Sequence, residues 1–94
     1  MKSIVQEKKE CFVCHTTQNL HDHHIFFGNA NRKLSEKYGL KCWLCGYHHN
    51  LSSEGVHQNI ELNHMLKEVA QMAFERQIGT RKEFMKIFGR NWIL

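Results

Sequence analysis

The chain of 94 residues contains no proline, no low-complexity segment and no internal repeat, so no stretch is typical of a linker between domains. No run approaches the roughly 18 apolar residues of a membrane span. The first ten residues, MKSIVQEKKE, lack the apolar core of a signal peptide. We therefore expect a single domain over residues 1–94, without a membrane partner, located in a cytoplasm.

A chain this short buries a smaller fraction of its surface than a larger protein does, and it often needs an additional link to hold its fold. The four cysteines are the candidates, spaced as Cys11-Phe-Val-Cys14 and Cys42-Trp-Leu-Cys45. Because thiols stay reduced in a cytoplasm, this spacing indicates metal ligands before it indicates disulfides.

Acidic side chains are outnumbered, 9 against 13 Lys and Arg, which gives a formal charge of +4 and a sequence pI near 9.0. This balance favours an anionic partner, although charge alone does not identify one. The basic residues near the C-terminus are interpreted first as solvated charges and alternatively as a phosphate-contacting face: Arg76, Arg81, Lys82, Lys86 and Arg90.

The spacing of apolar residues predicts short strands and amphipathic helices after a polar N-terminal arm over residues 1–10. Residues rich in strand formers alternate with segments whose apolar side chains recur every three or four positions. A Thr followed three positions later by Glu has the spacing of a capping box, and glycines stand where helices are expected to end. Strands are expected within His21–Phe27 and 40–44, and helices within 29–39, over Ile60–Gln77 and from Thr80 to Gly89.

Histidine is crowded into two short stretches, "LHDHHIFFG" at 20–28 and "LCGYHHN" at 44–50. Burying paired imidazoles without partners is costly. Metal binding or proton transfer would supply those partners.

The order of these stretches resembles the HNH endonucleases, whose ββα-metal fold is held in many members by a zinc between two Cys-x-x-Cys pairs. "HHIFFG", "SEKYGL", "LC-x-x-HHN" and "GVH", followed by "FGRN", are more closely similar to the small stand-alone HNH proteins encoded by bacteriophages. The resemblance covers about residues 11–57. It implies an α+β fold with a zinc-stapled, treble-clef-like ββα-metal core over 11–57, C-terminal helices over 58–94 and, for a phage protein, the host cytoplasm.

Two zinc ligand sets are open. One consists of thiolates alone, from Cys11, Cys14, Cys42 and Cys45, and the other replaces Cys42 with His48. Both are acceptable tetrahedral sets. The family pattern favours the second, because only that register places the next histidine directly after the last zinc ligand.

The resemblance also implies roles for the remaining histidines. His23 matches the ligand of a catalytic cation, His24 the general base and His49 a ligand offered from a helix, while His57 is a further candidate ligand. Phosphodiester hydrolysis requires a deprotonated water and neutralisation of developing charge, and an imidazole can accept the proton near neutral pH. Imidazole nitrogens suit Mn²⁺ or Ni²⁺ at least as well as Mg²⁺.

The sequence departs from the family at the middle asparagine, which braces the loop carrying the base. Leu40 stands at that position. Arg32 and Lys33 are candidate contacts to a DNA backbone, Asp22 is a candidate for orienting a neighbouring ring, and His57 is alternatively a phosphate contact. Three asparagines are candidates for the brace, and three histidines are interpreted as plain polar residues: Asn29, Asn31 and Asn50, and His15, His21 and His64.

The expected function is hydrolysis of DNA phosphodiester bonds by a metal-dependent HNH endonuclease with a structural Zn²⁺ and a catalytic divalent cation. The alternative is a non-catalytic, zinc-stapled DNA-binding or adaptor module. A module of that kind needs only the four zinc ligands, which leaves the remaining histidines of "DHH" and "HHN" unexplained. A zinc-dependent deaminase is excluded because the chain has no His-x-Glu and no proline before a cysteine pair.

Overall fold

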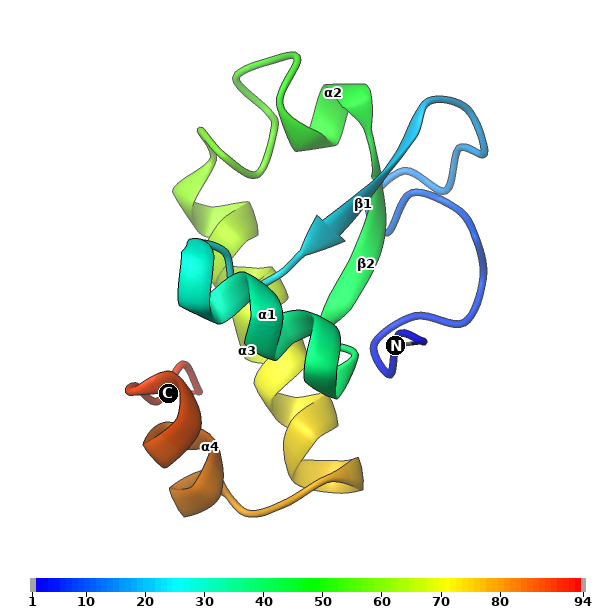
Figure 1. Ribbon diagram of the computed structural model, residues 1–94. Helices are drawn as coiled ribbons and strands as arrows, with labels where there is room; N and C mark the ends of the chain where they lie inside the picture. The colour runs from blue at the N-terminus through cyan, green and yellow to red at the C-terminus, as the bar shows by residue number, and fades with distance from the viewer. Residues whose placement is uncertain (1, 94) are drawn as a thin grey trace.

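Two antiparallel strands and four helices form the described part of the chain, residues 2–93, in this computed structural model (Figure 1). The expected α+β class is confirmed at that level. None of the helices in residues 2–93 combines the length and apolarity that crossing a membrane requires. The elements are β1 (Leu20–His24), α1 (Asn29–Tyr38), β2 (Lys41–Cys45), α2 (Gly46–His49), α3 (Ile60–Gln77) and α4 (Arg81–Phe88).

The register of the sheet brings the end of β2 beside the start of β1. Leu20 lies opposite Cys45, and His24 lies opposite Lys41. The helix that follows β2 therefore begins next to the start of β1, and Figure 1 shows α1 and α2 at opposite ends of the sheet. Side chains from β1 and α2 are thereby brought together.

The first strand differs from the expected one, which included residues up to Phe27. β1 ends at His24 because the next residues bond elsewhere: the Phe26 backbone pairs with the side chain of Ser35 on α1. Only the Ile25 N–H continues the pairing, to the Leu40 carbonyl at 3.0 Å. The chain therefore turns away from the sheet directly after the two adjacent histidines.

The helices follow the sequence pattern closely. α3 has the predicted bounds. The capping box at the start of α4 is present in both directions, with Thr80 and Glu83 each bonding the other's backbone N–H. Gly39 ends α1 with φ 71°, and a Cβ there would lie 2.5 Å from the Lys2 carbonyl oxygen. Glycine is required by both constraints.

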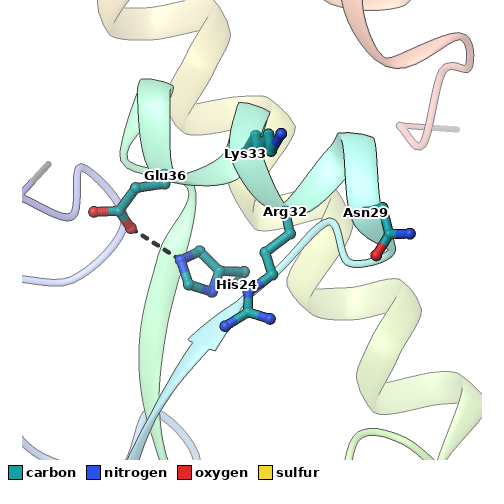
Figure 2. Close-up of a pocket in the computed structure, with 5 residues that line it drawn as sticks. All are labelled: His24, Asn29, Arg32, Lys33 and Glu36. Atoms are coloured by element: carbon teal, nitrogen blue, oxygen red, sulfur yellow. Dashed lines mark hydrogen bonds and ion pairs between the residues drawn. The ribbon is translucent and has the colours of Figure 1, made fainter.

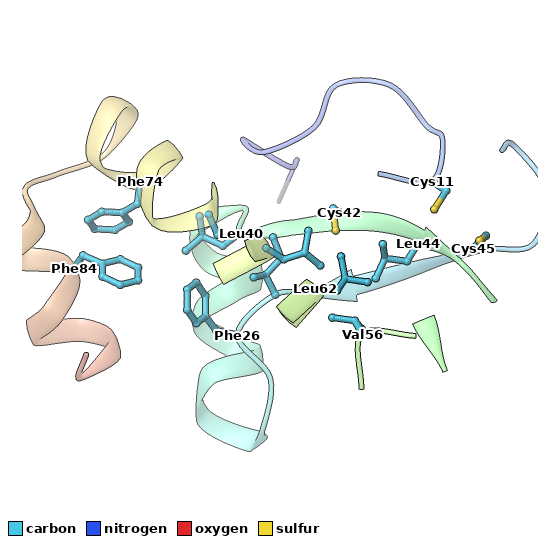
Figure 3. Close-up of a cluster of buried hydrophobic side chains, with 13 residues drawn as sticks. Cys11, Phe26, Leu40, Cys42, Leu44, Cys45, Val56, Leu62, Phe74 and Phe84 are labelled. Atoms are coloured by element: carbon cyan, nitrogen blue, oxygen red, sulfur yellow. The ribbon is translucent and has the colours of Figure 1, made fainter. Parts of the chain in front are cut away.

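One apolar core connects the sheet with the helices (Figure 3). Leu44 lies on β2, and Leu40 is the residue directly before that strand. Both pack in the same cluster as Leu62 and Leu66 of α3. In Figure 3 the aromatic rings of Phe74 and Phe84, from α3 and α4, lie at one end of this cluster, and Cys11 and Cys45 lie at the other. The end of the core that contains Cys11 and Cys45 thus lies away from these aromatic rings.

Ser35 ties α1 to the segment that follows β1. It is fully buried, and its hydroxyl accepts from the Phe26 N–H at 3.1 Å and donates to the Phe26 carbonyl at 2.8 Å. Ser35→Ala should lower the free energy of unfolding by about 1–3 kcal/mol, because two buried backbone groups lose their partner. Urea unfolding measures this loss. Ser53→Ala, at an exposed loop position, is the control, and equal midpoints for the two variants would contradict the prediction.

Candidate metal centres and the adjoining cleft

Three cysteines and one histidine meet where β2 runs into α2, and we call them the Cys3His group: Cys11, Cys14, Cys45 and His48. The Cys14 and Cys45 sulfurs lie 3.7 Å apart. His48 Nδ1 lies 3.3 Å from the Cys45 sulfur and 3.8 Å from that of Cys11. A tetrahedral zinc, with bonds of about 2.3 Å to sulfur and about 2.0 Å to nitrogen, separates its ligand atoms by roughly 3.5–3.8 Å. The group therefore fits a zinc ion.

Local backbone structure positions these ligands. Cys45 is the N-cap of α2, so His48 lies one helical turn later. Burial would raise the pKa of the Cys11 thiol, but hydrogen bonds from the backbone of Cys14, Cys45 and Val13 outweigh it and lower that pKa to about 6. Backbone donors that stabilise a thiolate favour metal ligation at this sulfur.

Cys42 does not belong to this group. It is buried on β2 opposite His23, and burial raises the pKa of its thiol to about 12. A protonated, buried thiol behaves as a small apolar side chain. Of the two expected ligand sets, the one that contains His48 has its donor atoms within 4.8 Å of one another, and Cys42 lies outside that group.

A second cluster, the three-histidine group, consists of His23 on β1, His49 on α2 and His57 on the loop before α3. His49 Nε2 lies 3.2 Å from His57 Nε2. The ring centroid of His23 lies 5.3 Å from that of His49 and 5.5 Å from that of His57. These three rings line one open cavity, so the sequence-predicted cation ligands converge.

His23 shows that the three-histidine group fits a cation. Its ring is 3% exposed, and its Nε2 atom has no hydrogen-bond partner within the described residues. Burial, together with repulsion from His49 and His57, lowers the pKa of His23 to about 3. The ring is therefore neutral near pH 7 and has a lone pair to offer. Buried polar atoms are rarely left unpaired, and a divalent cation would satisfy this one.

His21, which the sequence indicates as a plain polar residue, lies against the three-histidine group without belonging to it. Its Nδ1 lies 2.8 Å from His49 Nδ1, while the other ring nitrogen of His49 faces His57. A partner on the second nitrogen fixes the orientation of a ligating imidazole. The available signal was the spacing His21-x-His23, because residues two apart on a strand share a face. Of the others, exposed His15 lies 3.5 Å from Glu10, and His64 packs on Trp92.

His24 extends to the other side of β1, toward α1. Its Nε2 lies 2.9 Å from a carboxylate oxygen of Glu36, and Lys41 Nζ lies 3.0 Å from the same oxygen (Figure 2). When Nε2 donates to Glu36, Nδ1 is left as the basic nitrogen. No spacing rule pointed to Glu36, because the sequence does not show which helix face meets His24.

Asp22 does not orient a ring among the described residues. Its carboxylate is exposed and lies 3.5 Å from Lys41 Nζ. Asp22, His24 and Glu36 also place donor atoms within 4.8 Å of one another. The ammonium of Lys41 already contacts both carboxylates, so we assign no cation to this cluster.

The cleft beside His24 is lined by residues from the start of α1. Arg32 borders both the hollow beside Glu36 and the cavity of the three-histidine group, whereas Lys33 borders only the first. In Figure 2 the Arg32 side chain extends toward His24 and Lys33 points away from it. Of the two predicted phosphate contacts, Arg32 is the better placed.

The predicted bracing asparagine is not found. Within residues 2–93 none of the three candidate amides makes a hydrogen bond, although Asn29 borders the cleft. The loop after His24 is held instead by the buried Ser35 hydroxyl. The three candidates were Asn29, Asn31 and Asn50.

No family model, curated protein or solved structure matches this chain. The fold and the sites define a small α+β protein with one Cys3His group suited to zinc and a second group of three histidines in an open cleft. Any more specific function rests on the geometry described above.

Proposed function

We propose that this protein is a metal-dependent nuclease of the HNH type, which hydrolyses phosphodiester bonds in DNA. The observation that carries the proposal is the buried, unpartnered nitrogen of His23 in the three-histidine group. His24 borders the same cavity. In this proposal β1, β2 and α2 correspond to the ββα-metal core of that family, and α1 lies between its two strands in the sequence.

Each side chain of the cleft has a distinct role in the proposed reaction. Bound by His23, His49 and His57, a divalent cation would neutralise charge on the phosphate and on the leaving oxygen. His24 accepts a proton from water through Nδ1, since its Nε2 is held by Glu36. The guanidinium of Arg32 binds a phosphate oxygen, as arginine does elsewhere.

The competing function is a zinc-stapled DNA-binding or adaptor module without catalysis. The Cys3His group and the basic charge would suffice for it. The three-histidine group favours the nuclease, because a binding module has no need for three converging imidazoles with an unpartnered buried nitrogen. Basic charge and Arg32 suit backbone-dominated binding with little sequence preference.

Nicking of supercoiled plasmid by the purified, zinc-loaded protein tests the proposal. We expect nicking when Mn²⁺ or Ni²⁺ is added, at a rate at least equal to that in Mg²⁺, because three imidazole ligands suit those ions better. Protein without added divalent cation is the control. Cleavage in Mg²⁺ that far exceeds cleavage in Mn²⁺ would show that the cation ligands are carboxylates, and no nicking in any metal would favour the binding module.

A further inference from the structure

Lys67 on α3 is a half-buried cation held between aromatic rings rather than by a carboxylate. Its Nζ lies 4.7 Å from the ring centroid of Phe27 and 4.6 Å from that of Trp92. Within residues 2–93 no carboxylate lies at ion-pair distance from it. Burial and repulsion from Arg90 lower its pKa. The ammonium is thus partly desolvated without an anionic partner, a costly arrangement that a bound anion would relieve.

The chain beyond α4 holds this arrangement in place. Gln71 is fully buried on α3, accepts from the backbone N–H of Trp92 at 2.7 Å and donates to the Asn91 side chain at 2.7 Å. The Arg90 guanidinium lies 3.9 Å from the Trp92 ring centroid. Two cations, Lys67 and Arg90, therefore share one indole, and Gln71 holds the backbone of the residue that carries it.

Phe27 connects this pair of cations with the candidate catalytic cleft. Its side chain is 40% exposed and lines the cavity of the three-histidine group. Its ring centroid lies 5.2 Å from that of His57 and 6.1 Å from that of His23. Lys67 is also close enough to contribute to the repulsion felt by His23. A strand with one phosphate at the histidines can therefore pass over Phe27 toward Lys67.

We propose that Lys67 and Arg90, positioned by Trp92, form a second phosphate-binding position, which takes a backbone phosphate of the substrate strand near the one at the three-histidine group. Phe27 lies between the two positions and contacts the intervening nucleotide. The inference rests on the proposed function for its substrate. Lysine and arginine bind phosphate through charge and hydrogen bonds, so this position adds affinity and alignment without reading sequence.

Binding of a short fluorescent DNA duplex tests the position. Anisotropy is measured with zinc-loaded protein and no second metal, so that no turnover occurs, over a range of salt concentrations. Lys67→Met removes the charge and keeps an unbranched side chain between the rings of Phe27 and Trp92. Arg90→Gln removes the charge and keeps a polar side chain beside Trp92. Each should reduce the slope of log K against log salt by about 1, because one phosphate contact is lost. Lys67→Arg should keep the wild-type slope.

Lys8→Met is the matched control, since Lys8 is an exposed lysine on the N-terminal arm. A slope unchanged in Lys67→Met, or reduced equally in Lys8→Met, would overturn the phosphate position. Thermal melting confirms that the variants are folded. The outcome is separable from that of the proposed function. If the protein never cuts DNA but its binding slope depends on Lys67, the phosphate position is supported and the nuclease proposal is rejected. If the protein cuts DNA and Lys67→Met leaves the slope unchanged, the nuclease proposal is supported and the phosphate position is rejected.

Discussion

One zinc ion per chain is expected at the Cys3His group, and removing it with a strong chelator should unfold the protein. Zinc-finger peptides gain roughly 10–16 kcal/mol from their metal at pH 7, which is comparable with the total stability of roughly 5–15 kcal/mol that is typical of a small domain. Here the group links the turn containing Cys11 to the end of β2. The same turn is also joined to β2 by the hydrogen bond from the Phe12 N–H to the Trp43 carbonyl, at 2.8 Å.

Metal analysis of the purified protein and far-ultraviolet circular dichroism before and after chelation measure this effect. Loss of the helical signal with chelation, and its recovery when zinc is restored, is the expected result. A protein that contains no zinc, or one whose spectrum is unchanged after the metal is stripped, would contradict it.

Two cysteine variants separate the ligand sets. Cys45→Ser should lose zinc and fail to fold, because a tetrahedral site loses one of four ligands. Cys42→Ala is the matched control on the same strand, and it should retain one zinc per chain at a cost of about 1 kcal/mol for a small change in the core. Zinc loss in Cys42→Ala would instead establish the all-thiolate set.

The second large effect is expected in His24→Ala. Removal of a general base typically costs about 10² to 10⁴ in rate, so plasmid nicking should nearly cease. Zinc content, helical signal and DNA binding should stay close to wild type, because His24 belongs to neither the Cys3His group nor the three-histidine group. Its hydrogen bond to Glu36 is the only polar contact that the substitution removes in the described part of the chain.

Three measurements on His24→Ala and a control variant decide this assignment: the nicking rate at saturating DNA and metal, the zinc content and the melting temperature. His15→Ala is the control, since His15 is exposed, contacts Glu10 and does not line the cleft. His23→Ala should behave differently from His24→Ala, with activity that recovers partly at higher metal concentration. If His24→Ala nicks DNA at the wild-type rate, His24 is not the general base.

The elements that the sequence predicted well are those whose signals are local. α3 was predicted with its observed bounds, because apolar residues recur along one face over 18 positions. The capping box at Thr80 and the glycine after α1 depend only on neighbouring residues. The short spacing of Cys11 and Cys14 is a local signal of the same kind, whereas the resemblance to the HNH family added Cys45 to their ligand set.

Only the tertiary structure decided which distant side chains meet. The preference for His48 over Cys42 depends on where the two residues lie: Cys42 is opposite His23 on β2, outside the Cys3His group, and His48 is one turn into α2. The contacts of His21 with His49, of Glu36 with His24 and of Lys67 with Phe27 join residues 28, 12 and 40 positions apart. Spacing along a chain shows which residues share a face of one element. It does not show which face of another element packs against it, because that depends on how the whole core closes.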